Sequence, residues 1–230
     1  MKRLITILSI GLLCASCASH NVSSDEGNDA MSNQSADALF EQGDHYAKGI
    51  DVPQDYNTAI KYYEAAAKKG SSKAQYALGY LYRTGKGVDR NYNQAAEWFE
   101  RAAQQGNADA QHSLGVRYLL GQGTAQNYEK AQYWLEKSAN QGNPYAENEL
   151  GFMYAAGKGV PQNYAIAMQW YQKAADHGLA SAQYNLGLMY ANGIGTPVDK
   201  VKATELFRSA ATRGFRPAKK ALAAQAQTHP

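Results

Sequence analysis

The apolar residues of this chain recur with the spacing of helices that bury one face. Ala74, Leu78 and Tyr82 lie four residues apart, so in a helix they form a single stripe. Further along the chain, a second stripe follows the i, i+3, i+4, i+7, i+8 spacing of a helix with a broad buried face. This second stripe consists of Ala95, Trp98, Phe99, Ala102 and Ala103. The pattern predicts two helices joined by a turn.

Capping residues mark where these helices begin and end. The Gly-Lys-Gly-Val turn, Gly85 to Val88, ends the first helix with residues that accept positive φ. An Asp or Asn at the N-cap of each second helix supplies an acceptor for free backbone N–H groups. These residues are Asp55, Asn91, Asn127, Asn163 and Asp199. Asn107 is expected to cap a first helix in the same way, and Pro144 fits a first helical turn.

The whole pattern repeats with a period of 36 residues, without insertion or deletion. One series of glycines lies inside the first helices, at Gly43, Gly79, Gly115, Gly151 and Gly187. A tyrosine follows each of them, at Tyr46, Tyr82, Tyr118, Tyr154 and Tyr190. Glycine inside a helix costs roughly 0.5–1 kcal/mol relative to alanine, so its recurrence predicts a close approach by a neighbouring helix.

We therefore expect an all-α fold: a right-handed α/α solenoid of five 36-residue helix-turn-helix repeats, because stacked pairs bury stripes that one pair leaves exposed. The repeats, called units one to five, span 36–71, 72–107, 108–143, 144–179 and 180–215. Residues 216–230 are expected to form a capping helix and a tail. We assign the recurring Tyr82, Trp98, Trp134 and Trp170 to the core.

The residues carry a resemblance to a known family. The pattern Ala74-x3-Leu78-Gly79-x2-Tyr82-x2-Gly85, followed by Ala95-x2-Trp98-x3-Ala102-Ala103-x2-Gly106, resembles the Sel-one-like repeat (SLR) family, which is related to the tetratricopeptide repeats. The resemblance covers roughly residues 36–216. It implies a binding protein, in which the first helix of each pair lines a groove that receives a partner protein.

The N-terminal residues have the layout of a secretory signal peptide. Lys2 and Arg3 precede an apolar run from Leu4 to Leu13, and small residues then lead to Cys17. The Leu-Cys-Ala-Ser-Cys stretch resembles a bacterial lipobox, so residues 1–17 are predicted to be a signal peptide and Cys17 a lipidation site. The alternative is an ordinary signal cleaved nearby, which would give a soluble periplasmic protein.

Residues 18–35 are mostly Ser, Asn, Asp and Gly, which predicts a flexible tether. Removing residues 1–17 takes two of the 23 basic residues and none of the 20 acidic ones, leaving 21 against 20. A nearly neutral chain without a Lys/Arg cluster does not favour nucleic acid. The expected location is the Gram-negative envelope, facing the periplasm, with Ala18 after the cysteine favouring the outer membrane.

No arrangement in the sequence predicts catalysis, a cofactor or a metal site. His45, His112 and His177 fall at unrelated positions of the repeat, and no Cys/His cluster has metal-ligand spacing. The cysteine-rich branch of the SLR family has been described as penicillin-binding or β-lactamase-like, which leaves a β-lactam-binding or hydrolysing enzyme as one alternative. The repeats of this chain lack the cysteines of that branch.

The predicted function is a scaffold or adaptor that binds another protein. Positions of the first helices that vary between units are expected to face the partner, because the invariant positions are used in packing. The predicted contact residues are Tyr76, Tyr80, Arg83, His112, Val116, Leu119, Asn148, Phe152, Tyr184 and Leu188. The family resemblance also implies an alternative: an immunity protein that neutralises a periplasmic lipase toxin of an interbacterial secretion system.

Overall fold

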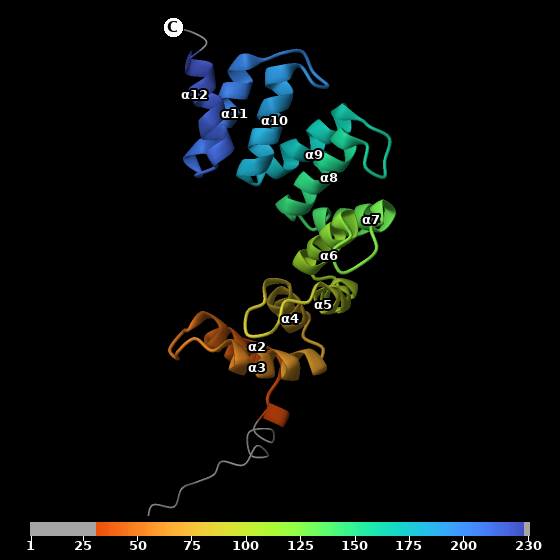
Figure 1. Cartoon of the computed structure of the whole chain (residues 1–230), viewed down its shortest axis with the longest axis vertical. Coiled ribbons are helices and arrows are strands. Elements are labelled where there is room, and N and C mark those ends of the chain that lie inside the picture. Colours follow the sequence, from red (N-terminus) through yellow and green to blue (C-terminus); the bar gives the residue numbers. More distant parts are fainter. Residues whose placement is uncertain (1–30, 228–230) are drawn as a thin grey trace, which may run out of the picture. The chain divides into compact units, whose positions relative to one another are not determined.

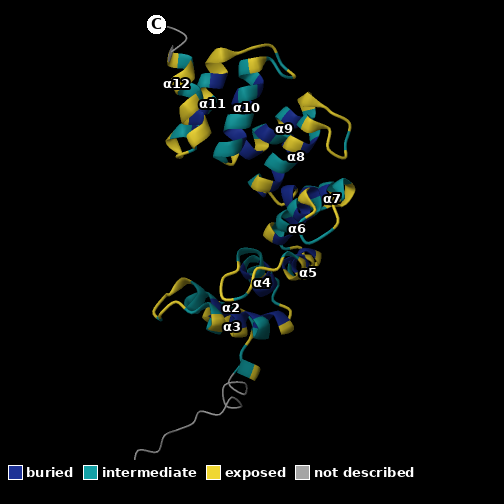
Figure 2. Cartoon of the chain, in the orientation of Figure 1, coloured by how far each residue is buried: buried dark blue, intermediate teal, exposed yellow. Residues whose placement is uncertain are grey.

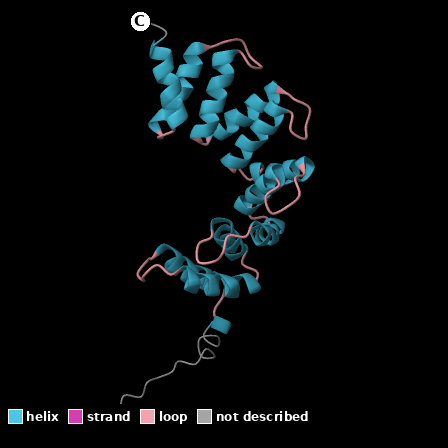
Figure 3. Cartoon of the chain, viewed as in Figure 1, coloured by secondary structure: helices cyan, strands magenta, loops and turns pink. Residues whose placement is uncertain are grey.

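A computed structural model of the chain describes residues 31–227, and in that range helices alternate with turns and no strand occurs (Figures 1 and 3). The helices are α2 Ala36–Lys48, α3 Tyr56–Lys68, α4 Ser72–Thr84, α5 Tyr92–Gln104, α6 Ala108–Leu120, α7 Tyr128–Ala139, α8 Pro144–Ala156, α9 Tyr164–Asp176, α10 Ala180–Asn192, α11 Lys200–Thr212 and α12 Arg216–Gln227. The predicted all-helical solenoid is confirmed.

Each unit contributes a first and a second helix. The first helices are α2, α4, α6, α8 and α10, and the second helices are α3, α5, α7, α9 and α11. Every helix packs against the next one along the chain, so each internal unit is covered on both sides. Buried residues, dark blue in Figure 2, recur along all of these helices. The core is therefore continuous through the repeats, as stacked pairs require.

The predicted caps form hydrogen bonds at the helix ends. The Asn91 side chain accepts from the backbone N–H groups of Asn93 and Gln94, and the side chain of Asn107 accepts from that of Ala110. The first helices end on a glycine in the left-handed region, with φ between 65° and 73°. In unit one the second turn glycine is replaced by Asp51, which adopts φ 60°. Asp tolerates this region better than most residues.

The helical glycines lie against the second helix of their own unit. A Cβ atom on Gly79 would stand 2.6 Å from Cδ1 of the Phe99 ring, well inside van der Waals contact. The partners of the other four glycines are Tyr63, Leu135, Tyr171 and Phe207. The close approach expected from the sequence is confirmed, because a large side chain occupies the space that a Cβ atom would take.

The core assignment of the tryptophans is wrong. Phe99 is fully buried, whereas Trp98 beside it is only partly buried and carries the Arg101 guanidinium 4.5 Å from its ring centroid. Trp170 is likewise partly buried, with Lys173 Nζ at 4.2 Å. The two adjacent positions lie about 100° apart on a helix, so one enters the core and the other borders it. Tyr82 is also only partly buried.

Buried glutamines connect neighbouring units. In unit three, Gln111 Nε2 donates to the carbonyl of Ala103 in unit two at 3.1 Å, while its Oε1 accepts from Gln141 at 2.7 Å. Gln75 makes the corresponding pair of bonds with Ala67 and Gln105. These bonds add an inter-unit donor to carbonyl groups in the last turns of second helices, which the backbone of the following turn also contacts.

The predicted capping helix is present as α12. It packs on α11, and its Ala218, Ala221 and Leu222 join a core cluster with Phe207. α12 thereby covers the apolar side of unit five, which would otherwise be exposed. None of the helices described between residues 31 and 227 combines the length and the apolar character needed to cross a membrane.

Candidate functional site

The equivalent positions 76, 112, 148 and 184 lie where one first helix meets the next. The His112 ring in α6 stands 5.8 Å from that of Tyr145 in α8, measured between centroids. Asn148 Oδ1 in α8 accepts from Asn185 Nδ2 in α10 at 3.0 Å. These side chains were expected on an open face, but the structure makes them half-buried contacts between units. They form the floor of the first-helix surface.

The next positions, 80, 116, 152 and 188, differ from one another in exposure. Phe152 is 43% exposed, although phenylalanine is usually buried. Tyr80 is partly buried, with the Arg83 guanidinium 5.0 Å and Lys86 Nζ 5.6 Å from its ring centroid. Val116 packs at the edge of the core of units three and four. Only Phe152 in this series offers a large free apolar surface.

The prediction that Leu119 lies on the surface is wrong. Leu119 is 5% exposed and packs in the core cluster with Leu135, Leu150 and Met153. Unit three also departs from its neighbours at position 117 of the same helix. Other units place Leu81, Met153 and Met189 there, all buried, but unit three has Arg117.

Four of the predicted residues line one pocket of 270 Å³ that is formed by three first helices. Tyr76 and Arg83 come from α4, and His112 and Val116 come from α6. The remaining lining residues are Asp109, Ser113, Arg117 and Tyr145. The sequence therefore identified half of this pocket, and the structure adds the other half.

The pocket keeps its histidine uncharged. Burial, opposed by Asp109 and reinforced by Arg117 and Arg83, lowers the pKa of His112 to about 4. Burial and then the Arg83 charge lower the pKa of Arg117. Burial and then Asp109 raise the pKa of Tyr76. At neutral pH the charged groups of the pocket are the two arginines and the carboxylate of Asp109.

At the C-terminal end, α12 covers part of the predicted surface. The Tyr184 ring lies 5.4 Å from that of Phe215, and Leu188 packs against the cluster that contains Ala218. Tyr184 also lines a hollow with Arg216, Lys219 and Lys220. Tyr184 and Leu188 were expected to face a partner. In the structure, the C-terminal part of the same chain packs against them.

Tyr145 is the exposed residue that sequence reasoning missed. It is 57% exposed on α8, seven residues before Phe152, so both side chains lie on the same face of that helix. Comparing the units with one another could have pointed to it, since the same position holds Lys73, Asp109 and Ser181. A single aromatic residue among small and charged equivalents is unusual for a packing position.

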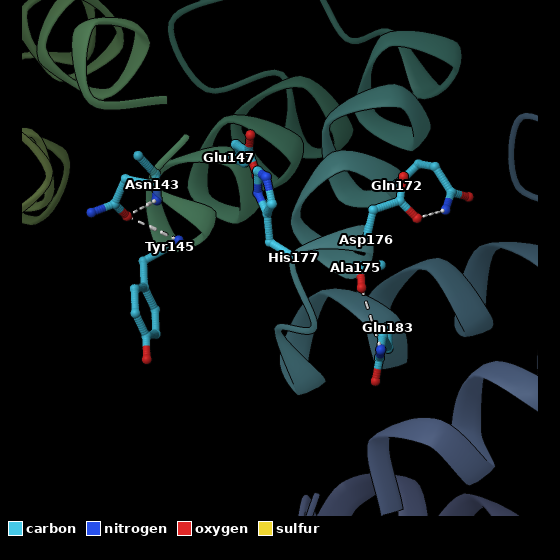
Figure 4. Close-up of polar contacts among 9 residues, drawn as sticks. Asn143, Tyr145, Glu147, Gln172, Ala175, Asp176, His177 and Gln183 are labelled. Atoms are coloured by element: carbon cyan, nitrogen blue, oxygen red, sulfur yellow. Dashed lines mark hydrogen bonds and ion pairs between the residues drawn. The ribbon is translucent and has the colours of Figure 1, made fainter. Parts of the chain in front are cut away.

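A buried carboxylate in unit four belongs to the connection between helices. Glu147 takes the place of the buried glutamines, and its Oε2 lies 2.9 Å from Nδ1 of His177, while Gln183 donates to the carbonyl of Ala175 (Figure 4). The side chain of Glu147 is 4% exposed. Within residues 31–227, no three His, Cys, Asp or Glu side chains gather as a metal site would require.

Comparison with known proteins gives a consistent family. The profile of the Sel1 repeat family matches residues 36–71, 72–107, 108–143, 144–179 and 180–215. A Sel1 repeat protein of Oxalobacter formigenes is 34% identical with a TM-score of 0.80, over 84% of this chain and 76% of that one. No curated protein sequence matches the chain.

Two further solved structures are similar. A protective antigen of uropathogenic Escherichia coli with an SLR fold is 40% identical, with a TM-score of 0.74, over 80% of this chain. The match covers 39% of that antigen, so this chain spans well under half its length. An immunity protein of Pseudomonas aeruginosa is 25% identical, with a TM-score of 0.54, over 80% of this chain and 67% of that one.

Proposed function

The chain belongs to the Sel1 repeat family, and from this premise we propose that it binds a partner protein through the exposed face of its first helices. Sel1 repeat proteins are protein-interaction scaffolds. The observation that carries the proposal is the pair of exposed aromatic side chains on α8, Tyr145 and Phe152, of which Tyr145 also lines the pocket between α4, α6 and α8. Exposed aromatics next to a polar hollow are typical of contact sites.

A pair of double variants tests this surface. Tyr145→Ser with Phe152→Ser removes both rings from the first-helix face and should abolish the capture of crosslinked partners from envelope fractions. Tyr133→Ser with Tyr164→Ser removes two exposed rings, 51% and 39% exposed, from second helices and should leave capture unchanged. Equal capture by both variants would contradict the proposed face. Circular dichroism should stay helical in both.

We propose in addition that Cys17 anchors the protein in a bacterial envelope membrane, with the repeats on the periplasmic side and the outer membrane as the favoured site. The lipobox-like sequence supports this proposal, although Cys17 lies outside the described residues. Cys17→Ser should move the protein from the membrane to the soluble fraction, whereas Cys14→Ser should leave it bound. Membrane association of the Cys17→Ser protein would refute the anchor.

A second candidate function is immunity. The similarity to an immunity protein of Pseudomonas aeruginosa favours it, because that protein shares the fold over 80% of this chain. The partner would then be a toxin, such as a periplasmic lipase. Deleting the gene should make cells sensitive to a toxin encoded beside it. Full resistance of the deletion strain, or a gene neighbourhood without a toxin, would contradict the immunity function. The general scaffold function would then be the one that stands.

A further inference from the structure

Arg117 is a buried cation without a counter-charge. The residue is 7% exposed, and neither its Nε nor its Nη1 atom has a hydrogen-bond partner. Its guanidinium lies over the face of Tyr92, at 5.6 Å from the ring centroid. Burying an ionised group without hydrogen bonds is costly. Units two, four and five avoid the cost with Leu81, Met153 and Met189 at this position, while unit one has the half-buried His45.

The nearest acidic residue does not neutralise this charge. Asp109 lines the same pocket, but its Oδ1 accepts a hydrogen bond from Asn143 at 3.0 Å. Within residues 31–227, neither Arg83 nor Arg117 forms an ion pair with a carboxylate. The pocket therefore holds two guanidinium groups whose charges repel each other.

The pocket has room for one small group. Its volume is 270 Å³, below the 300–1,000 Å³ common for small-molecule sites. It opens beside Tyr145, which is 57% exposed, and thus next to the proposed contact face. Arg117, with its unpaired N–H groups, and Arg83 both line this space. The ligand that fits is one carboxylate, because the guanidinium fork pairs with its two oxygens.

We propose that this pocket receives a carboxylate of the partner protein, held by Arg117 and Arg83. The proposal rests on the proposed function and names the chemistry that the partner must present there. The carboxylate accepts from both guanidinium groups and removes their mutual repulsion. Asp109 disfavours a dianion at the same place, so a carboxylate is preferred to a phosphate. Tyr76 and Tyr145 exclude water around the ion pair, which strengthens it.

The repeats themselves provide the test variants. Arg117→Met introduces the residue that units four and five carry, and Arg83→Ala introduces that of Ala155 and Ala191. Both variants should fold, since the same repeat already accommodates these side chains. Arg101→Met, on the exposed side of α5, is the matched control. The probe is sodium acetate, followed on the Nε–Hε NMR signals of the full ¹⁵N-labelled chain at constant ionic strength.

In the wild type, the Arg117 signal, assigned by its absence from Arg117→Met, should shift saturably with acetate. Acetamide, which has the same shape and no charge, should leave it in place. The Arg83→Ala variant should bind acetate about tenfold more weakly, the value of one charge-assisted hydrogen bond, and Arg101→Met should bind normally. A linear shift, an equal response to acetamide, or tighter binding of phosphate than of acetate would overturn the proposal.

Partner capture separates this proposal from the general function. Arg117→Met should lose most of the capture while Tyr145 and Phe152 remain in place, and Arg101→Met should retain it. Undiminished capture by Arg117→Met would exclude the pocket from recognition while leaving the aromatic face as the binding surface.

Discussion

At the scale of the residue, the packing depends on positions where a small side chain is required and on one position where a large charged side chain is buried. Gly79 lacks a Cβ, and a Cβ atom added there would lie only 2.6 Å from Cδ1 of the Phe99 ring. The opposite situation occurs at Arg117, where a large cation stands at an aliphatic position. The glycine allows close packing of the two helices, whereas the buried arginine disturbs the packing of the apolar core. The two residues therefore make opposite predictions for substitution.

Gly79→Ala should destabilise the fold by roughly 1–3 kcal/mol, because overpacking of a full core outweighs the better helix propensity of alanine. The free energy of unfolding in urea measures the effect. In the background of Phe99→Ala, which empties the space, the same substitution should cost nothing or stabilise. A penalty of equal size in both backgrounds would show that the ring does not cause it.

Arg117→Met should stabilise the fold by about 1–3 kcal/mol, because it removes an unsatisfied buried cation and restores the apolar position. The melting temperature should rise by roughly 2–4 °C for each kcal/mol in a chain of this size. The reverse change, Leu81→Arg, should lower it. A melting temperature that falls in Arg117→Met would mean that the arginine has structural partners.

His112 should make stability depend on pH. Its pKa falls from 6.5 to about 4 on folding, so the unfolded chain binds a proton that the folded one refuses. Stability is fully present above pH 6.5, and about 3 kcal/mol is lost as the pH falls to 4. The difference in unfolding free energy between wild type and His112→Asn, measured at pH 7 and pH 4, isolates this contribution. No change in that difference would refute the buried, neutral His112.

At the scale of the element, the helices were predictable and their contacts were less so. Asn91 and Gly85 determine ends locally, through bonds within one turn, so sequence alone places them. Which side of a helix meets the next unit depends on how the pairs stack. For that reason the half-buried state of His112 and the inward turn of Leu119 were not predictable. The same holds for Trp98, whose spacing fits a core position.

The buried glutamines connect the first helix of one unit to the second helix of the unit before it. Gln111→Ala should destabilise the protein by about 1–3 kcal/mol, since it removes two buried hydrogen bonds, one to Ala103 and one to Gln141. Amide hydrogen exchange should accelerate at the junction of α5 and α6. Gln104→Ala, at an exposed position of α5, is the control and should change neither quantity.

At the scale of the whole molecule, one packing arrangement is used in all five units, and three departures from it lie on the first helices α6 and α8. The repeated small and apolar residues fill the core. Tyr145, Phe152 and Arg117 differ from the residues at the equivalent positions and do not contribute to this packing. The last helix, α12, covers Tyr184 and Leu188, which leaves α4, α6 and α8 as the surface where these departures lie. The proposed binding face therefore lies on units two, three and four.

The most direct measurement is site-specific photo-crosslinking in cells. A benzophenone amino acid at position 145 or 152 should crosslink the full-length protein to a partner, because both side chains face the proposed binding surface. The same probe at position 133 or 164, on the second helices, should give no such product. Crosslinks from positions 133 and 164 with none from 145 and 152 would contradict the account.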